Sequence, residues 1–326
     1  MLKDPTFEQK EEKYRRIESD VPSFENEKKE IEITLEPDGK PKALAFFDID
    51  STLGNFKDIH GKAIQELYPN HDPEEVAQEF FKGQSLGTTY RVHDRLIKIF
   101  DDGLEEFKDV DRYMKWFSEH VSEIDKEGGA HEKASAYSFK HSQLAAGMAE
   151  NLYQKDPSYF EKAKIVPVFK LVKLYKRMGI PMTVMTANDK PFAESICKCL
   201  NLSDSFITLA YQQDFEGGGK DRAMEVLLDK IKEKNVPIPE KLIVVGDSLN
   251  GDIGPGAAFQ NRHNDFEVAG VLISDGNLED DRLKIAENKD LKNINVEVLD
   301  SSKVTEDAVG EPQIALFRKK YQTKND

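Results

Sequence analysis

The sequence predicts an α/β fold: a doubly wound parallel sheet core with an inserted all-helical domain. Three observations lead to this prediction. Short, continuous apolar runs recur along the chain, and such runs are typical of strands covered on both faces. From residue 167 onward these runs alternate with helix-like segments. Residues 56–165, between the first run and the second, carry only helical patterns.

The first expected strand is ALAFFD, residues 43–48, which is apolar up to its last position. A strand with one exposed face would alternate polar and apolar residues, so both faces of this one should be buried. Further strands are expected at residues 181–186, 205–210, 241–247, 268–276 and 294–300. Helices are expected between these strands. Residues 167–179 are one example, because apolar residues recur there every three to four positions between a proline and a glycine.

The helical insert contains five amphipathic segments, at residues 58–69, 72–83, 90–102, 109–124 and 138–155. Its two connections to the sheet, near residues 55–57 and 162–167, should lie close together. The expected parts of the chain are a charged N-terminal extension (1–40), an α/β core (41–55 and 166–300), the helical insert (56–165) and a C-terminal tail (301–326). Within the extension we expect a short strand, IEITL (31–35), and a turn around Gly39.

The composition excludes several classes of partner. With 46 Lys and Arg against 61 Asp and Glu, the formal net charge of the 326 residues is −15. Non-specific nucleic-acid binding and anionic-membrane binding both need a positive surface, so we expect neither. No signal peptide or membrane-spanning run is recognisable, which predicts a soluble, cytoplasmic protein. Cys197 and Cys199 lie one residue apart on a predicted helix, and we expect them to be reduced thiols.

Polar residues follow the predicted strands at their carboxyl ends, where open α/β sheets bind ligands. Asp48 and Asp50 end the first strand, Thr186 ends the second, and Asp247 ends the strand at 241–247. Lys220 follows three glycines and precedes a helix. Because residues i and i+2 of an extended chain face the same side, Asp48 and Asp50 can both address one pocket.

These residue types suit phosphoryl transfer assisted by a divalent cation. Mg²⁺ prefers oxygen ligands and takes few carboxylates, which Asp48 and Asp247 could supply. With its charge offset, Asp48 could act as a carboxylate nucleophile. Asp50 could protonate the leaving oxygen and later deprotonate water. Thr186 and Lys220 would hold the non-bridging oxygens, where charge spreads in the transition state.

Four motifs resemble those of the haloacid dehalogenase superfamily, in the order typical of that family. FFDIDSTL resembles the first motif, MTVMT the second, GGGK the third and VVGDSLNGD the fourth, and together they span roughly residues 42–252. The stretch TANDKPFAESICKCLNL resembles the subgroup of phosphoglycolate phosphatases and related sugar-phosphate enzymes. In that subgroup a helical cap, the C1 type, is inserted between the first two motifs, as residues 56–165 would be here.

The resemblance implies a Rossmann-like core and a definite catalytic arrangement. Asp48 would be the nucleophile and Asp50 the general acid and base. Asp48, Asp247 and the main-chain carbonyl of Asp50 would bind Mg²⁺. Thr52 and Asp252 would support this metal-binding site.

The resemblance also implies contacts to the phosphoryl group from Thr186, Ala187 and Lys220. Two positions depart from the family pattern. Ser51 stands where the family often has glycine, and the lysine segment lacks the usual prolines, so Lys190 stays open as the alternative phosphate lysine. The dehalogenases lack the second aspartate, so Asp50 favours phosphoryl transfer over dehalogenation.

We therefore expect a Mg²⁺-dependent phosphatase that hydrolyses a small phosphorylated metabolite, a phosphate monoester, through an aspartyl-phosphate intermediate. A phosphomutase or a phosphonate hydrolase on the same scaffold is the alternative, although no lysine of the insert stands out as a Schiff-base former. Two alternatives of a different functional class also stay open: a receiver-like signalling module and a non-catalytic interaction protein. The insert after the first strand and the late Gly-Asp motif do not fit a receiver.

Substrate choice is expected to lie in the helical insert. A glycine-flanked loop there leads into a helix that carries Arg91, His93 and Arg95. We expect one or more of them to contact the non-reacting part of the substrate. The alternative is a solvated helix face held by salt bridges.

Overall fold

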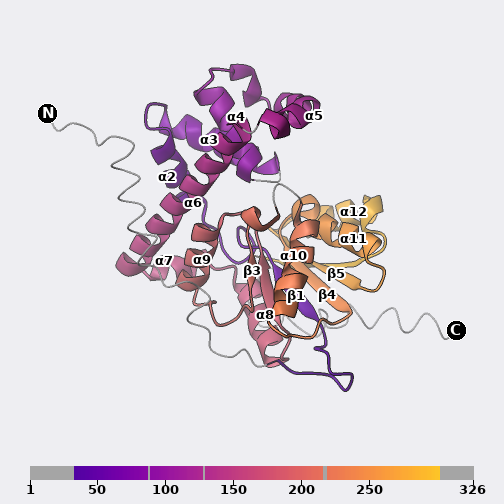
Figure 1. Ribbon diagram of the computed structural model, residues 1–326. Helices are drawn as coiled ribbons and strands as arrows, with labels where there is room; N and C mark the ends of the chain where they lie inside the picture. The colour runs from indigo at the N-terminus through magenta and orange to yellow at the C-terminus, as the bar shows by residue number, and fades with distance from the viewer. Residues whose placement is uncertain (1–32, 87–88, 128, 216–218, 302–326) are drawn as a thin grey trace.

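The computed structural model describes residues 33–86, 89–127, 129–215 and 219–301. Its centre is a sheet of six parallel strands in the order β3-β2-β1-β4-β5-β6, which confirms the predicted doubly wound fold (Figure 1). The strands are β1 (Leu44–Phe47), β2 (Met182–Met185), β3 (Leu209–Ala210), β4 (Lys241–Gly246), β5 (Glu267–Ser274) and β6 (Asn295–Asp300).

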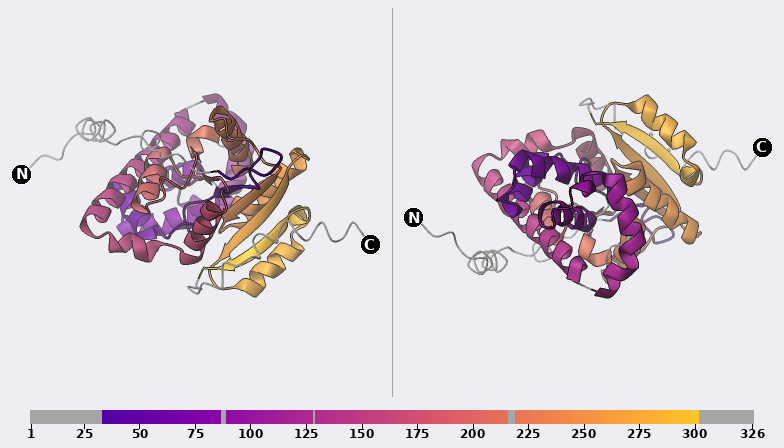
Figure 2. Two further views of the ribbon diagram at one scale, coloured as in Figure 1. Left: turned by 90° about the horizontal axis from the view of Figure 1, so that it is seen from below. Right: turned by 90° about the horizontal axis from the view of Figure 1, so that it is seen from above.

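Helices cover both faces of this sheet, which Figure 2 shows as one twisted layer. One face packs against α8 (Val166–Arg177) and α9 (Lys190–Cys199). The other face packs against α10 (Lys220–Glu233), α11 (Gly254–Arg262) and α12 (Leu278–Glu287).

The first strand shows why its sequence is apolar throughout. Phe47 belongs to the apolar cluster on the α8 side, and Phe46 belongs to the cluster on the α10 side. Both side chains are fully buried, and burying a phenylalanine contributes about 1.5–3 kcal/mol.

The strand order reverses direction between β1 and β4. The chain proceeds outward from β1 through β2 to β3, and then returns to the other side of β1 to form β4, β5 and β6. In open α/β sheets this switch leaves a crevice at the carboxyl ends of the two central strands. Asp48 follows β1 and Asp247 follows β4, so both stand at this crevice.

The insert is helical, as expected, and its upper helices gather at one end of the molecule in Figure 1. Two apolar clusters hold these helices together, one around Phe80 and Leu96 and one around Tyr113 and Phe117. Its helices are α2 (Lys57–Leu67), α3 (Pro73–Gly83), α4 (Thr89–Phe100), α5 (Val110–Glu127), α6 (Gly129–Lys155) and α7 (Ser158–Ala163), with short turns η1 (Gln84–Leu86) and η2 (Glu105–Lys108).

The two connections of the insert lie side by side, as expected. The amide of Asn55 donates to the carbonyl of Ala163 at 3.0 Å, and that of Ile165 donates to the carbonyl of Leu53 at 3.1 Å. The second half of α6, however, packs against α9, and its Ala145 belongs to the core cluster on that face. The insert is therefore anchored to the core along α6, and the division into separate domains stays a prediction.

Two expected strands differ in the structure. Residues 205–210 form a strand only at Leu209–Ala210, because β3 is an edge strand and pairs on one side only, with the short β2. In IEITL, Leu35 makes only an isolated bridge to Pro41 across the expected turn, where Gly39 has a φ of 76°. Most of the extension (1–32) and of the tail (302–326) lies outside the described residues.

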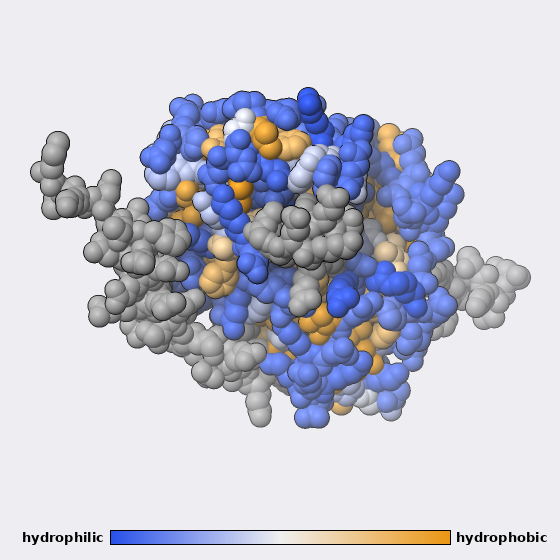
Figure 3. All heavy atoms as spheres, turned by 45° about the horizontal axis from the view of Figure 1, so that its top comes forward, coloured by the Kyte–Doolittle hydropathy of each residue, from blue (hydrophilic) through white to orange (hydrophobic). Residues whose placement is uncertain are grey.

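The described surface agrees with the charged composition. The face shown in Figure 3 is mostly hydrophilic, and apolar side chains are scattered over it. Cys197 and Cys199 are buried free thiols, as expected. No helix among the described residues is long and apolar enough to cross a membrane.

Candidate active site

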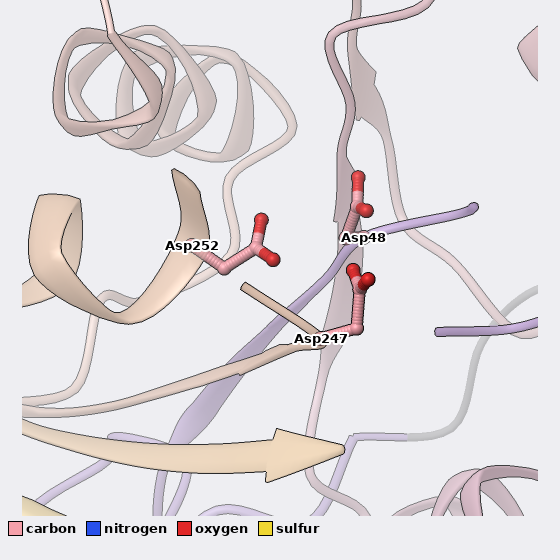
Figure 4. A group of neighbouring side chains, drawn as sticks. All are labelled: Asp48, Asp247 and Asp252. Atoms are coloured by element: carbon pink, nitrogen blue, oxygen red, sulfur yellow. The ribbon is translucent and has the colours of Figure 1, made fainter. Parts of the chain in front are cut away.

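Three aspartates meet at the crevice between β1 and β4. Asp48 follows β1, Asp247 follows β4, and Asp252 lies in the π-helical turn η4 (Leu249–Ile253). One carboxylate oxygen of each lies within 4.8 Å of the others, and Figure 4 shows the three side chains around a common space. Asp48 and Asp247 are thus close enough to share one cation, which is the geometry that the predicted chemistry requires.

Gly246 permits the close approach of Asp252. A Cβ atom at position 246 would lie 2.3 Å from the Cβ of Asp252, so no other residue fits there without a shift. The turn itself is held by Ser248, whose amide donates to Asp252 Oδ2 at 2.9 Å and whose hydroxyl accepts from the amide of Gly251 at 2.9 Å. Strand end and turn therefore place the Asp252 carboxylate beside the crevice.

Lys220, at the start of α10, supplies a positive charge to this group. Its Nζ lies 2.6 Å from Asp48 Oδ1 and 2.5 Å from Asp252 Oδ1. Burial alone would lower the pKa of Lys220, but Asp252 and Asp48 raise it above its ordinary value. Lys190, the alternative phosphate lysine, instead lies 3.9 Å from Glu194 and its side chain is half exposed. Of the three glycines before Lys220, only Gly219 is among the described residues.

One lysine does not neutralise three carboxylates. Burial raises the pKa of Asp48 well above its ordinary value, and Asp252 and Asp247 raise it further against the effect of Lys220. Burial and Asp252 raise the pKa of Asp247 to about 7, although its side chain still reaches solvent. If all three carboxylates were ionised, as a bound cation would favour, three negative charges would face one positive charge, an excess of two. An all-oxygen donor set with this excess fits Mg²⁺.

The oxygens of Asp252 already have partners, which suits a supporting role. Its Oδ1 contacts Lys220 and its Oδ2 accepts from Ser248. Thr52 is fully buried, and its hydroxyl donates to Asp247 Oδ1 at 3.5 Å. Asp48 and Asp247 are thus the better candidates for direct contact with a cation.

The hydrogen-bond partners of the Asp50 carboxylate lie outside this trio, in the helical insert and after β2. Its Oδ1 lies 3.3 Å from His60 Nε2 in α2, and its Oδ2 accepts from the side-chain amide of Asn188 at 2.6 Å. Burial alone would raise the pKa of Asp50, but His60 and Asn188 outweigh it and lower the pKa. The Asn188 side chain also donates to Thr186 Oγ1 at 3.0 Å, so it joins Asp50 to the end of β2.

The insert contacts the core just after the end of β2. The hydroxyl of Thr89, the first residue of α4, donates to the carbonyl of Ala187 at 2.7 Å. The amide of Thr89 donates to Gln212 Oε1 at 3.0 Å. Ala187 therefore lies where the insert meets the core.

The structure corrects the expectation for His93 and Arg95. The side chain of His93 is fully buried and its Nε2 lies 3.3 Å from His141, so it does not face a substrate in this conformation. The side chain of Arg95 is also fully buried, and its Nε donates to the carbonyl of Phe107 at 2.6 Å. The solvated-face alternative is equally wrong for these two residues. Arg91 donates to the carbonyl of Leu86 at 3.3 Å and its guanidinium lies 5.1 Å from the ring centre of Phe117. A substrate contact by Arg91 stays a prediction.

Ser51 has a backbone conformation that favours glycine. Its φ is 56°, in the left-handed region that costs an ordinary residue about 1–2 kcal/mol. Its amide donates to the carbonyl of Gly54 at 2.8 Å and closes the turn after β1.

Sequence reasoning missed His60, Asn188 and Thr89 as members of the site. Asn188 carried a signal, because it stands two residues after Thr186 at a strand end. His60 and Thr89 carried none, because they come from helices whose packing is not visible in the local sequence.

Solved structures similar to this chain include three bacterial proteins. CbbY from Rhodobacter sphaeroides, in complex with phosphate, is 16% identical, over 71% of this chain and 86% of that chain, with a TM-score of 0.42. YfnB from Bacillus subtilis, bound to magnesium, is 15% identical over 70% and 88%, with a TM-score of 0.41. A hydrolase from Pseudomonas syringae is 14% identical over 79% and 93%, with a TM-score of 0.42.

A search of curated proteins found no match. The family model of the haloacid dehalogenase-like hydrolases matches residues 42–260, which is more than half of the chain. This match spans β1, the helical insert and the carboxyl end of β4. The chain therefore belongs to the haloacid dehalogenase-like hydrolases.

Proposed function

We propose that this protein is a Mg²⁺-dependent phosphatase that hydrolyses a small phosphate monoester through an aspartyl-phosphate on Asp48. The meeting of Asp48, Asp247 and Asp252 within 4.8 Å at the switch between β1 and β4 is the observation that carries this proposal. Asp48, Asp247 and the main-chain carbonyl of Asp50 would hold the ion. When bound, Mg²⁺ supplies positive charge that offsets the repulsion between these carboxylates and a phosphoryl group.

In the first half-reaction a carboxylate oxygen of Asp48 attacks phosphorus, and the bond from phosphorus to the ester oxygen breaks. The Asp50 proton goes to that oxygen. In the structure Asp50 Oδ2 accepts from Asn188 and Oδ1 lies 3.3 Å from His60 Nε2. Both partners lower the pKa of Asp50 against the effect of burial, which favours its ionised form, the base. A phosphate anion brought beside it raises its pKa by like-charge repulsion and favours the protonated form.

In the second half-reaction Asp50 takes a proton from water, and the water oxygen attacks phosphorus. The bond between phosphorus and Asp48 breaks, which releases inorganic phosphate and restores the carboxylate. Lys220 neutralises charge on Asp48 and on the non-bridging oxygens, and Thr186 and Ala187 provide further contacts to them. Lys220, whose ammonium touches Asp48, is our choice over Lys190.

The insert contacts the core beside the proposed phosphate site. The hydroxyl of Thr89 in α4 donates to the carbonyl of Ala187 in this structure. We propose that this contact opens to admit substrate and closes to exclude bulk water during attack by Asp48.

A phosphate-release assay tests the proposal on a panel of phosphorylated metabolites, with and without Mg²⁺. Asp48→Asn should abolish turnover, while Asp229→Asn, an exposed aspartate paired with Lys232, should leave it unchanged. Activity without a divalent cation, or a fully active Asp48→Asn protein, would contradict the mechanism.

Hydrolysis in ¹⁸O-labelled water separates the phosphatase from the alternatives on the same scaffold. A phosphatase incorporates one solvent oxygen into each phosphate released. A phosphomutase returns the phosphoryl group to a sugar and incorporates none, and a phosphonate hydrolase acts on a substrate with a carbon–phosphorus bond.

A further inference from the structure

Three imidazoles form a row that leads from Asp50 into the insert. His60 Nε2 lies 3.3 Å from Asp50 Oδ1, and His60 Nδ1 lies 3.4 Å from His141 Nε2. His141 Nδ1 in turn lies 3.3 Å from His93 Nε2. The three rings come from α2, α6 and α4, so the row joins three helices of the insert to one carboxylate of the core.

The row is buried in apolar surroundings. His60, His141 and His93 are 5%, 2% and 0% exposed. The ring of Phe192 lies 4.3 Å from that of His60, and the ring of Phe80 lies 4.8 Å from that of His141, between centres. Burial lowers the pKa of His93 to about 3 and the pKa of His141 well below its ordinary value. Both rings are therefore neutral at physiological pH.

The direction of the hydrogen bonds follows from the carboxylate end. A neutral imidazole has one N–H donor and one acceptor nitrogen, and an ionised carboxylate only accepts. His60 therefore donates from Nε2 to Asp50, and in a neutral His60 ring Nδ1 is then an acceptor. His141 must then donate from Nε2 to His60, and His93 must donate from Nε2 to His141.

The far end of the row agrees with this direction. His93 Nδ1 is buried and has no hydrogen-bond partner among the residues that the structure describes. With all three rings protonated at Nε2, this atom is an acceptor. The reverse direction would require either a protonated Asp50 or a His60 ring that donates from both nitrogens. In either case an unpaired N–H would stand at the end of the row, which costs about 1–3 kcal/mol.

We propose that His141 and His93 are positioning residues for Asp50. They hold His60 in the tautomer that donates from Nε2, and through His60 they set the orientation of the Asp50 carboxylate, while Asn188 holds its other oxygen. The inference rests on the proposed function, in which Asp50 is the acid and base. The packing of α2, α4 and α6 thereby determines how Asp50 faces the crevice.

A matched pair of variants at His93 tests this. His93→Gln keeps an N–H donor at the position of Nε2, whereas His93→Leu removes it at similar volume. We expect His93→Leu to lower kcat about 10- to 100-fold with KM nearly unchanged, because a small misplacement of a catalytic group costs up to that factor. His93→Gln should recover most of kcat. His263→Gln, outside the row and paired with Glu225, is the control and should match the wild type.

The tautomers are read directly from ¹⁵N spectra of the imidazole rings in the full-length protein, with His→Gln variants for assignment. We expect His60, His141 and His93 to be protonated at Nε2 and not at Nδ1 in the wild type. In His93→Leu, no donor faces Nδ1 of His141, so a fraction of His141 should become protonated at Nδ1 and lose its hydrogen bond to His60. The spectrum of the wild-type protein needs no catalysis, so it tests the proposed tautomers even if a variant is too unstable for kinetics.

Two outcomes would overturn the inference: His60 or His141 protonated at Nδ1 in the wild type, or a wild-type kcat in a folded His93→Leu protein. Neither depends on the test of the proposed function. An active Asp48→Asn protein would refute the phosphatase mechanism. The ¹⁵N spectra would then still show whether the three histidines have the proposed tautomers. An inactive Asp48→Asn protein together with a fully active His93→Leu protein would refute only the positioning role of His93 and His141.

Discussion

Removing the ammonium of Lys220 should destabilise the protein strongly in the absence of a divalent cation. Lys220→Met keeps much of the side-chain volume and leaves Asp48 and Asp252 without their shared cation. The two contacts, at 2.6 and 2.5 Å, correspond to a gross attraction of roughly 13 kcal/mol at an effective dielectric constant of about 20. Desolvation offsets most of this, and removal of one partner from a buried pair typically costs about 3–5 kcal/mol.

Urea unfolding in EDTA measures this loss. We expect the midpoint of Lys220→Met to fall by an amount equivalent to about 3–5 kcal/mol with an unchanged m-value. Lys190→Met is the matched control, because its ammonium is half exposed and lies 3.9 Å from Glu194. Such a surface pair contributes about 0–1 kcal/mol.

Added Mg²⁺ should reverse part of the loss. A ligand that binds only the folded state stabilises it by RT ln(1 + [L]/Kd). Since the variant site carries one more uncompensated negative charge, its recovery of stability should exceed that of the wild type at equal Mg²⁺ concentration. Activity should stay low, because the contact to the phosphoryl oxygens is gone. A variant as stable as the wild type in EDTA, or equal losses in Lys220→Met and Lys190→Met, would refute the reasoning.

Two further predictions concern the turn after β1 and the contact between α6 and α9. Ser51→Gly should raise the free energy of unfolding by about 0.5–1 kcal/mol, since relief of the left-handed strain at φ 56° exceeds the added flexibility of the unfolded chain. Asn235→Gly, at φ 58°, should gain less because asparagine tolerates this conformation, and equal gains in chemical denaturation would contradict the explanation. Burial raises the pKa of Asp189 from 3.8 to about 6, partly offset by the Ser138 hydroxyl that donates to it at 2.7 Å. The folded state therefore binds the proton more tightly, so this contribution to stability is complete below pH 4 and is lost as the pH rises to about 6, at most about 3 kcal/mol. Asp189→Asn should remove that loss. In urea unfolding, the free energy of unfolding of the variant should therefore increase relative to that of the wild type between pH 4 and 6. A constant difference across this range would contradict the proposed effect of Asp189.

The strands and the acidic ends of β1 and β4 were predictable because both are encoded over short distances. An apolar run such as ALAFFD needs cover on both faces, whatever the neighbouring strands are. Asp48 and Asp247 follow such runs directly, and the carboxyl ends of parallel strands share one edge of the sheet. The edge strand β3 was predicted too long, because its length depends on its one partner and not on the apolar residues at 205–208.

The role expected for His93 failed for a related reason. Helical periodicity placed it on α4 but could not say what would cover that face of the helix. In the structure α6 brings His141 against it, and α2 brings His60 between His141 and Asp50. Positions 60, 93 and 141 are far apart in the chain, so no spacing rule connects them.

The sequence by itself determined the fold class, the helical nature of the insert and the set of acids at the crevice, because apolar period and position after a strand are local properties. Only the tertiary structure decided how α6 anchors the insert to α9, how Asn188 joins Asp50 to Thr186, and how three histidines line up behind Asp50. These contacts depend on the packing of helices that are distant in the chain, and packing is determined by the fit of whole surfaces and not by any short stretch of residues.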